Sequence, residues 1–154
     1  MNRMKKALLL VFGLVALSQV QAQLLNPVSW SFTAVKTGDK TYEIHMKATI
    51  QDKWHLYSQV QPENRIAEPT TFTINANPLF KLEGKIKELG RMEVMNDKDL
   101  GISANQYSQS VDFVQKIKLK ANAKTNFSGT VAYQTCDDKK CLPLKTVRFN
   151  VALN

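Results

Sequence analysis

The chain has few of the residues that metal sites and catalytic centres commonly use, because its 154 residues include only two cysteines and two histidines. The histidines, His45 and His55, do not form a metal-type pair with the cysteines, and a zinc site needs about four ligands. The chain also lacks an apolar run of the roughly 20 residues that a membrane-spanning helix requires. Internal repeats, low-complexity segments and, beyond the N-terminal segment, amphipathic helical patterns are missing as well. A metal centre and a helical fold are therefore disfavoured.

The positive charge of the chain is not gathered into a cluster. The formal net charge is +8, from 21 basic and 13 acidic side chains. The lysines are scattered between apolar positions, as in Lys116-Ile-Lys-Leu-Lys120, a pattern typical of the solvated side of a strand. Nucleic acid is therefore not predicted as a partner.

The N-terminal segment has the layout of a secretory signal peptide. Arg3, Lys5 and Lys6 precede an apolar stretch from Ala7 to Leu17, and Val20-Gln-Ala22 follows as a cleavage site. This apolar stretch is too short to cross a bilayer, which disfavours a membrane anchor. No cysteine follows the cleavage site, which disfavours a lipoprotein.

Cleavage after residue 22 predicts a signal peptide over 1–22 and a domain over 23–154. The mature chain then has 132 residues (154 minus 22) and a formal charge of +5 (8 minus three basic residues), which suits one domain with a core of its own. We expect no stable membrane insertion of this mature chain. Export to an oxidising compartment would allow the two cysteines to form a disulfide.

The mature chain is dominated by strand-like alternation. Residues 41–50 place five apolar side chains on one face, namely Tyr42, Ile44, Met46, Ala48 and Ile50. His45 falls on the other face and is predicted to be an exposed surface residue without a function. Similar short runs recur to the end of the chain, separated by turn residues. The pattern predicts an all-β domain, an antiparallel β-sandwich of the immunoglobulin-like class with seven to nine strands.

The two cysteines, Cys136 and Cys141, enclose four polar residues, Asp-Asp-Lys-Lys, between two strand-like runs. Such a hairpin turn would bring the two Cβ atoms close enough for a disulfide. A link closing so short a loop stabilises a fold by only roughly 2 kcal/mol, whereas adjacent sulfurs on a turn are easily reached by another protein's disulfide. Redox exchange is the leading hypothesis, and a structural disulfide in a secreted binding module is the alternative.

A third hypothesis is copper(I) handling by the two cysteines together with Met92 and Met95. Copper(I) prefers such soft sulfur ligands. The methionines also suit ordinary packing, so this hypothesis is the weakest of the three.

Two further stretches are candidates for the site. In the aromatic segment 52–59, Trp54 and Leu56 share one face of an extended chain, while His55 and Tyr57 share the other. One pair is predicted to be buried, and the other faces solvent or lines a cleft. The segment from Asn96 to Gln109 has weak periodicity and is predicted to be a loop with a short edge strand; loops of this length are often functional.

Residues 131–144, Val-Ala-Tyr-Gln-Thr-Cys-Asp-Asp-Lys-Lys-Cys-Leu-Pro-Leu, carry a family resemblance. They are similar to the Tyr-Gln-x-Cys and Cys-x-Pro motifs of the N-terminal periplasmic domain of the thiol:disulfide interchange protein DsbD. Residues 54–59, 69–72 and 112–116 add to the likeness, which covers essentially the whole mature chain.

The resemblance implies an immunoglobulin-like domain in the periplasm that uses no metal or organic cofactor. Such a domain receives electrons from a thioredoxin-like, membrane-linked donor and passes them to disulfide-containing acceptors, including disulfide isomerases and the cytochrome c maturation path. It implies that Cys141 forms the mixed disulfide with partners and that Cys136 resolves it. A donor supplied by another chain is expected.

The resemblance also implies a cap loop, which falls in 96–102, with Asp97, Asp99 and Leu100 as cap or site-lining residues beside Tyr57 and His55. The sequence departs from the family in three places. It has four residues between the cysteines where relatives often have five, leucine where the cap carries phenylalanine, and it lacks the additional tyrosine that relatives usually carry near the position of His55. These departures concern the shielding of the sulfurs more than the exchange chemistry, which needs two close sulfurs and an approachable face.

Overall fold

The computed structural model describes residues 25–153, and the regular secondary structure in that range consists of strands alone. Eleven strands follow one another: β1 (Val28–Gly38), β2 (Thr41–Ile50), β3 (His55–Tyr57), β4 (Thr71–Ile74), β5 (Phe80–Leu89), β6 (Met92–Asp97), β7 (Ile102–Tyr107), β8 (Ser110–Leu119), β9 (Thr125–Tyr133), β10 (Thr135–Cys136) and β11 (Lys145–Leu153). The predicted signal peptide over 1–22 lies outside the described residues. Between residues 25 and 153 no helix is long and apolar enough to cross a membrane.

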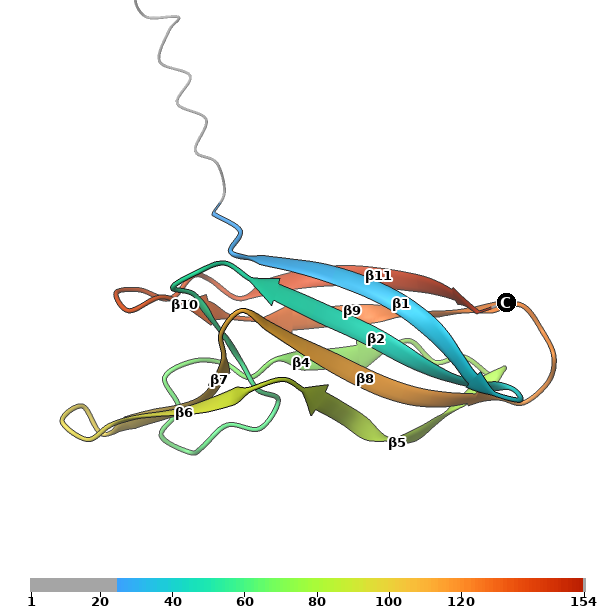
Figure 1. Cartoon of the computed structure of the whole chain (residues 1–154), viewed down its shortest axis with the longest axis horizontal. Coiled ribbons are helices and arrows are strands. Elements are labelled where there is room, and N and C mark those ends of the chain that lie inside the picture. Colours follow the sequence, from blue (N-terminus) through green and yellow to red (C-terminus); the bar gives the residue numbers. More distant parts are fainter. Residues whose placement is uncertain (1–24, 154) are drawn as a thin grey trace, which may run out of the picture.

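The strands form three sheets with the orders β1-β2-β8-β5, β11-β9-β4 and β10-β3-β7-β6. All paired strands are antiparallel. The first two sheets enclose the main core, and their long strands run along the length of the molecule (Figure 1). The predicted antiparallel β-sandwich is therefore confirmed, although it has more strands than the seven to nine expected.

The alternation of β2 shows why the sandwich forms. Its five predicted core side chains, from Tyr42 to Ile50, are each at most 5% exposed. Burying a large apolar side chain contributes about 1.5–3 kcal/mol, and a one-residue slip of the strand would turn all of them toward solvent. The burial of this one face therefore determines how β2 pairs with β1 and β8.

An aromatic cluster joins the two large sheets. Trp30 of β1 lies 5.9 Å from Phe113 of β8 in its own sheet, measured between ring centroids. It also lies 6.1 Å from Phe72 of β4 and 5.4 Å from Tyr133 of β9 in the opposite sheet. Ring pairs at such distances contribute about 0.5–1.5 kcal/mol beyond their buried area. The cluster holds the two large sheets together at the end that adjoins the third sheet, because Tyr133 is the last residue of β9 before β10.

The third sheet is built from continuations of the sandwich strands. β3 follows β2, β6 follows β5, β7 precedes β8 and β10 follows β9, each after a short break. Gly90 lies at one of these breaks, and a Cβ atom there would be 3.1 Å from the carbonyl oxygen of Ser110 and 3.3 Å from Cδ1 of Tyr107. These distances are shorter than most real Cβ contacts, so any other residue here would require the neighbouring bend to shift. The bends carry β10 and its cysteine to one end of the molecule, opposite the end where the chain stops (Figure 1).

Two expectations drawn from the sequence are wrong. The segment from Asn96 to Gln109 is not a loop, because β6 and β7 pair as a regular hairpin. Its alternation was hidden because buried positions of β7 are small or polar: Ala104 is 1% exposed and Gln106 is 8% exposed. His45 is half-buried rather than exposed, and its Nδ1 lies 2.7 Å from Oδ2 of Asp112.

Candidate functional site

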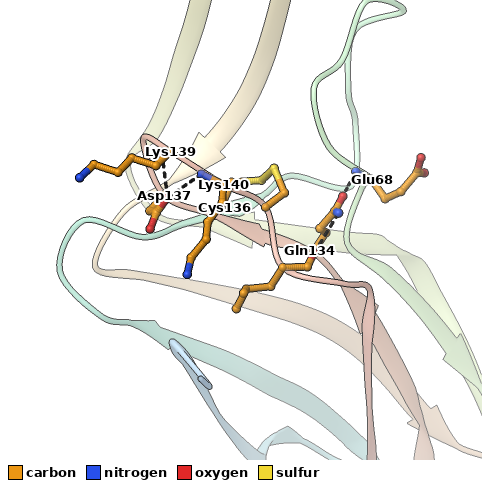
Figure 2. The surroundings of a disulfide bond; sticks show 8 residues. Glu68, Gln134, Cys136, Asp137, Lys139 and Lys140 are labelled. Atoms are coloured by element: carbon orange, nitrogen blue, oxygen red, sulfur yellow. Dashed lines mark hydrogen bonds between the residues drawn. A yellow bond between two sulfur atoms is a disulfide. The ribbon is translucent and has the colours of Figure 1, made fainter. Parts of the chain in front are cut away.

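The two cysteines are bonded to each other across a tight turn at the end of β10 (Figure 2). Their Cα atoms are 4.0 Å apart. Two backbone hydrogen bonds bracket the pair: Leu142 N–H to the Thr135 oxygen at 2.8 Å, and Asp137 N–H to the Lys140 oxygen at 2.9 Å. Cys136 and Cys141 therefore form a non-hydrogen-bonded antiparallel pair, in which opposite Cα atoms are closest. The predicted meeting of the two sulfurs on a hairpin turn is confirmed.

The side chain of Asp137 organises this turn. Its Oδ1 atom accepts hydrogen bonds from the backbone N–H groups of Lys139 and Lys140, each at 2.8 Å (Figure 2). These two hydrogen bonds, the one from Lys139 first, lower the pKa of the Asp137 carboxyl. The turn is therefore held by its own polar contacts as well as by the disulfide.

The two sulfur-bearing residues differ sharply in their access to solvent. Cys136 is only 3% exposed, whereas Cys141 is an exposed residue. Cys136 packs in a small apolar cluster with Tyr57, Ala67 and Ala104, and Met95 lies against the same cluster. Another molecule could therefore approach the disulfide from the side of Cys141.

The site occupies one face of the third sheet. Cys136 pairs with His55 across β10 and β3, Tyr57 pairs with Gln106 across β3 and β7, and Ala104 pairs with Met95 across β7 and β6. Because side chains alternate along each strand, these six residues share a face. The structure thus brings His55 and Tyr57 to the cysteines, as the sequence resemblance implied, while Trp54 and Leu56 lie in the main core.

His55 is held by partners from two other segments. Its Nδ1 atom is 3.0 Å from Oγ of Ser108, which in turn donates a hydrogen bond of 3.0 Å to Oε2 of Glu93. Its Nε2 atom is 3.9 Å from Oδ1 of Asp138 in the cysteine turn. The imidazole is partly covered, with its side chain 21% exposed. Ser108 and Glu93 could not be found from sequence patterns, because these contacts depend on the bend between β7 and β8.

Tyr57 packs in the same buried cluster as Cys136. It is 2% exposed, and this burial raises the pKa of its phenol to about 12. Its backbone oxygen accepts a hydrogen bond of 2.6 Å from Oγ1 of the buried Thr70. The phenol is therefore neutral at physiological pH, and Tyr57 acts as a fixed apolar surface.

The predicted cap residues lie at the tip of the β6–β7 hairpin. Oδ1 of Asp97 accepts hydrogen bonds from the N–H groups of Asp99 and Leu100, both at 3.0 Å, which closes the tip. The Leu100 side chain is 71% exposed. The parts of this hairpin that pack against the Cys136 cluster are Met95 and Ala104, lower on the strands. The role of Asp97, Asp99 and Leu100 as a cap stays a prediction.

Gln134, just before β10, fastens the cysteine turn to the rest of the domain. Its Nε2 atom donates to the Leu142 oxygen at 3.0 Å, and its Oε1 atom accepts from the Glu68 N–H at 2.9 Å (Figure 2). One amide thus joins both sides of the turn to the loop before β4. Gln134 lies in the Tyr-Gln-x-Cys motif, so the sequence marked its position without revealing its contacts.

The structure separates two of the ligands that the copper hypothesis requires. Met95 is on the cysteine face, but Met92 is three residues earlier on the same strand and therefore points to the opposite face. Within residues 25–153, no group of three or more His, Cys, Asp or Glu side chains has a metal-binding arrangement.

The family model described as the N-terminal region of the thiol:disulfide interchange protein DsbD matches residues 21–153. The chain belongs to this family. The match to the DsbD N-terminal family covers almost the whole chain and includes both cysteines. No curated protein sequence matches the chain.

Two solved structures share the fold of this DsbD N-terminal family member. One is the DsbD N-terminal domain of Neisseria meningitidis in the reduced form, with a TM-score of 0.54 and 16% identity over 85% of this chain and 91% of that one. The other is the N-terminal periplasmic domain of ScsB from Proteus mirabilis, with a TM-score of 0.53 and 16% identity over 80% of this chain and 44% of that one. The immunoglobulin-like fold predicted from the sequence is confirmed. Family membership and the Cys136–Cys141 disulfide together support thiol:disulfide exchange at this site.

Proposed function

We propose that the protein carries electrons between a thioredoxin-like, membrane-linked donor and disulfide-containing acceptor proteins of the periplasm, through the Cys136/Cys141 pair. The observation that carries this proposal is the disulfide itself, with one exposed and one buried cysteine at an end of the sandwich. The reduced form of the Neisseria meningitidis domain and the periplasmic location of the Proteus mirabilis domain support it by analogy. The signal-peptide pattern of residues 1–22 agrees with export.

The unequal exposure of the two cysteine residues supports different roles for them. Exchange requires in-line attack of a thiolate on a disulfide sulfur, so the sulfur that meets a partner must be accessible. Cys141 is exposed and forms the mixed disulfide, while the buried Cys136 attacks Cys141 from within the protein and releases the partner. The residues Tyr57 and His55 line this site, and the hairpin tip with Asp97, Asp99 and Leu100 shields it from non-partner thiols.

A purely structural disulfide in a secreted binding module is the second candidate function. The local contacts argue against it, because the turn is already closed by two backbone hydrogen bonds and by the side chain of Asp137. The bond closes a sequence separation of only five residues. A link over so short a loop removes little entropy from the unfolded chain.

Single-cysteine variants test the role of each sulfur. Reduced Cys136→Ser protein retains the attacking thiol and should accumulate a mixed disulfide with an oxidised partner, detected on a non-reducing gel. The matched variant Cys141→Ser retains only the buried thiol and should trap at least tenfold less partner. Equal trapping by the two variants would show that the roles are wrongly assigned. Absence of trapping by both, against several thioredoxin-like proteins, would favour the structural disulfide.

A further inference from the structure

We propose that His55 is the acid–base group of the exchange reaction, taking the proton from Cys136 and returning it to the departing partner, with Ser108 and Glu93 holding its ring in the required tautomer. The inference rests on the proposed exchange function and adds the proton transfers that this function needs. Three observations support it: the burial of Cys136, the register of β3 and β10, and the hydrogen bonds of the imidazole.

The buried position of Cys136 creates the need for a base. Only the thiolate attacks a disulfide sulfur. Cys136 is 3% exposed and packs against Tyr57, Ala67 and Ala104, and apolar burial disfavours the charged form of a thiol. Solvent water has little access to such a thiol. Its proton must therefore be accepted by a neighbouring side chain.

His55 is placed to accept that proton. It is the direct cross-strand partner of Cys136 in the β3–β10 pair. Directly opposite residues have Cβ atoms about 4.5–5.5 Å apart and project from the same face. The Nε2 atom lies 3.9 Å from Oδ1 of Asp138, two residues after Cys136, so this nitrogen is on the side of the cysteine turn.

The hydrogen bonds of Ser108 determine which ring nitrogen is free. The Ser108 hydroxyl has a single proton, and it lies 3.0 Å from a carboxylate oxygen of Glu93, which can only accept. The hydroxyl oxygen must then accept the hydrogen bond from His55, whose Nδ1 is 3.0 Å away. Nδ1 therefore carries the proton of the neutral ring. Nε2 is left with a lone pair on the side of the turn.

Two carboxylates flank the imidazole ring, one beyond each nitrogen. Glu93 on β6 acts through Ser108, and Asp138 in the turn faces Nε2 directly, although Asp138 is 87% exposed and screened by water. Tyr57, two residues along β3, is neutral because burial raises its pKa to about 12.

The reaction balances with these groups alone. The Cys141 thiolate, having lost its proton to solvent, attacks the partner disulfide, forms the mixed disulfide and releases one partner sulfur, which takes a proton from solvent. Nε2 of His55 then accepts the proton of Cys136, whose thiolate attacks the sulfur of Cys141. The bond between Cys141 and the partner breaks, and the departing sulfur receives the proton from His55. The partner disulfide is reduced to a dithiol, and the Cys136–Cys141 pair is oxidised by two electrons.

The experiment uses oxidised glutathione as the partner of the fully reduced protein. Acid quenching and mass spectrometry follow the glutathione adduct on Cys141, which forms in the first step and disappears when Cys136 resolves it. In His55→Gln the amide still bonds Ser108 but accepts no proton. Resolution should be at least tenfold slower at pH 7. General acid–base catalysis typically contributes about 10²–10⁴-fold, and the expected loss is smaller because a thiol also ionises unaided. The difference between the two rates should shrink as the pH rises, because a growing fraction of the Cys136 thiol then ionises without a base.

Matched variants separate proton transfer from structural damage. His45→Gln removes the other histidine, which also pairs with a carboxylate but lies on the first sheet, and should resolve the adduct at the wild-type rate. Glu93→Gln keeps a hydrogen-bonding group beside Ser108 and removes the charge. The Ser108 hydroxyl proton is then no longer directed to a carboxylate, so Nδ1 is less firmly held as the protonated nitrogen. Resolution at pH 7 should slow, less than in His55→Gln, and the difference from wild type should shrink as the pH rises. Ser108→Ala frees the ring and should slow resolution less than His55→Gln does.

The outcomes decide between the proposals. Equal rates for wild type and His55→Gln at pH 7 overturn the role of His55, as does slowing by the same factor at every pH, which indicates damaged packing. If His55→Gln does not fold, the resolution rate of Glu93→Gln decides, and a rate equal to that of wild type at pH 7 overturns the proposal. If no glutathione adduct forms on Cys141 even in Cys136→Ser, the exchange function itself is wrong, and the inference falls with it.

Discussion

Reducing the Cys136–Cys141 disulfide should leave the domain folded, with a small loss of stability. The bond closes a loop with a sequence separation of five, for which the chain-entropy relation gives roughly 2 kcal/mol. The main core does not include either cysteine, and the hydrogen bonds that bracket the turn join backbone atoms rather than the sulfurs. The expected decrease in the free energy of unfolding is therefore about 2 kcal/mol or less, which lowers Tm by no more than about 10 °C.

The assay is guanidinium unfolding of the oxidised and reduced protein, followed by tryptophan fluorescence. Trp54 is buried in the core and Trp30 packs against it, so both report on global unfolding. The double variant Cys136→Ala/Cys141→Ala is the control, because it lacks the bond and should show no effect of dithiothreitol. A loss of about 4 kcal/mol or more on reduction, or loss of the cooperative transition, would refute the reasoning and favour a structural disulfide.

Three further predictions concern the packing of the sandwich and the surroundings of the site. Gly129→Ala should destabilise the domain by about 2–3 kcal/mol in a denaturant titration, because its Cβ would collide with the carbonyl oxygen of Thr73, whereas Gly38→Ala, with nothing nearer than 3.7 Å, should have little effect. Because burial raises the pKa of Tyr57 to about 12, its neutral phenol stabilises the fold fully below pH 10, and this contribution is lost as the pH rises toward 12. Tyr57→Phe should therefore lose less stability than wild type between pH 10 and 12, and an equal loss in the two proteins would contradict the argument. Asp137→Ala removes two hydrogen bonds from the turn and should speed hydrogen exchange at the amides of Lys139 and Lys140, and unchanged exchange would show that the side chain does not order the turn.

The sequence was sufficient for the elements whose burial alternates strictly. β2 has the predicted bounds, Thr41–Ile50, and the predicted buried face, because large apolar side chains mark every second position. The β6–β7 hairpin was missed because the face it buries carries Ala104 and Gln106, which give no apolar period. The bends that divide long strands between two sheets are not marked by a change in the pattern of apolar residues. The number of strands was therefore underestimated.

For the site, the sequence supplied the residues, and the fold supplied their relations. The spacing of Cys136 and Cys141 predicted the turn, and the family motifs marked His55 and Tyr57. The unequal exposure of the two cysteines depends on how β10 packs against β3, and short sequence patterns do not encode that packing. The contact between His55 and Ser108 joins residues 53 positions apart, so only the folded register reveals it.

The redox midpoint of the cysteine pair tests the central claim most directly. The mature protein would be equilibrated in glutathione or dithiothreitol buffers of graded potential, with Cys136 and Cys141 followed by thiol alkylation and the fold by circular dichroism. An electron carrier should give a midpoint within about −120 to −270 mV, the span of known exchange proteins, with the fold retained in both states. A midpoint below about −300 mV, with unfolding on reduction, would contradict the account and identify the bond as structural.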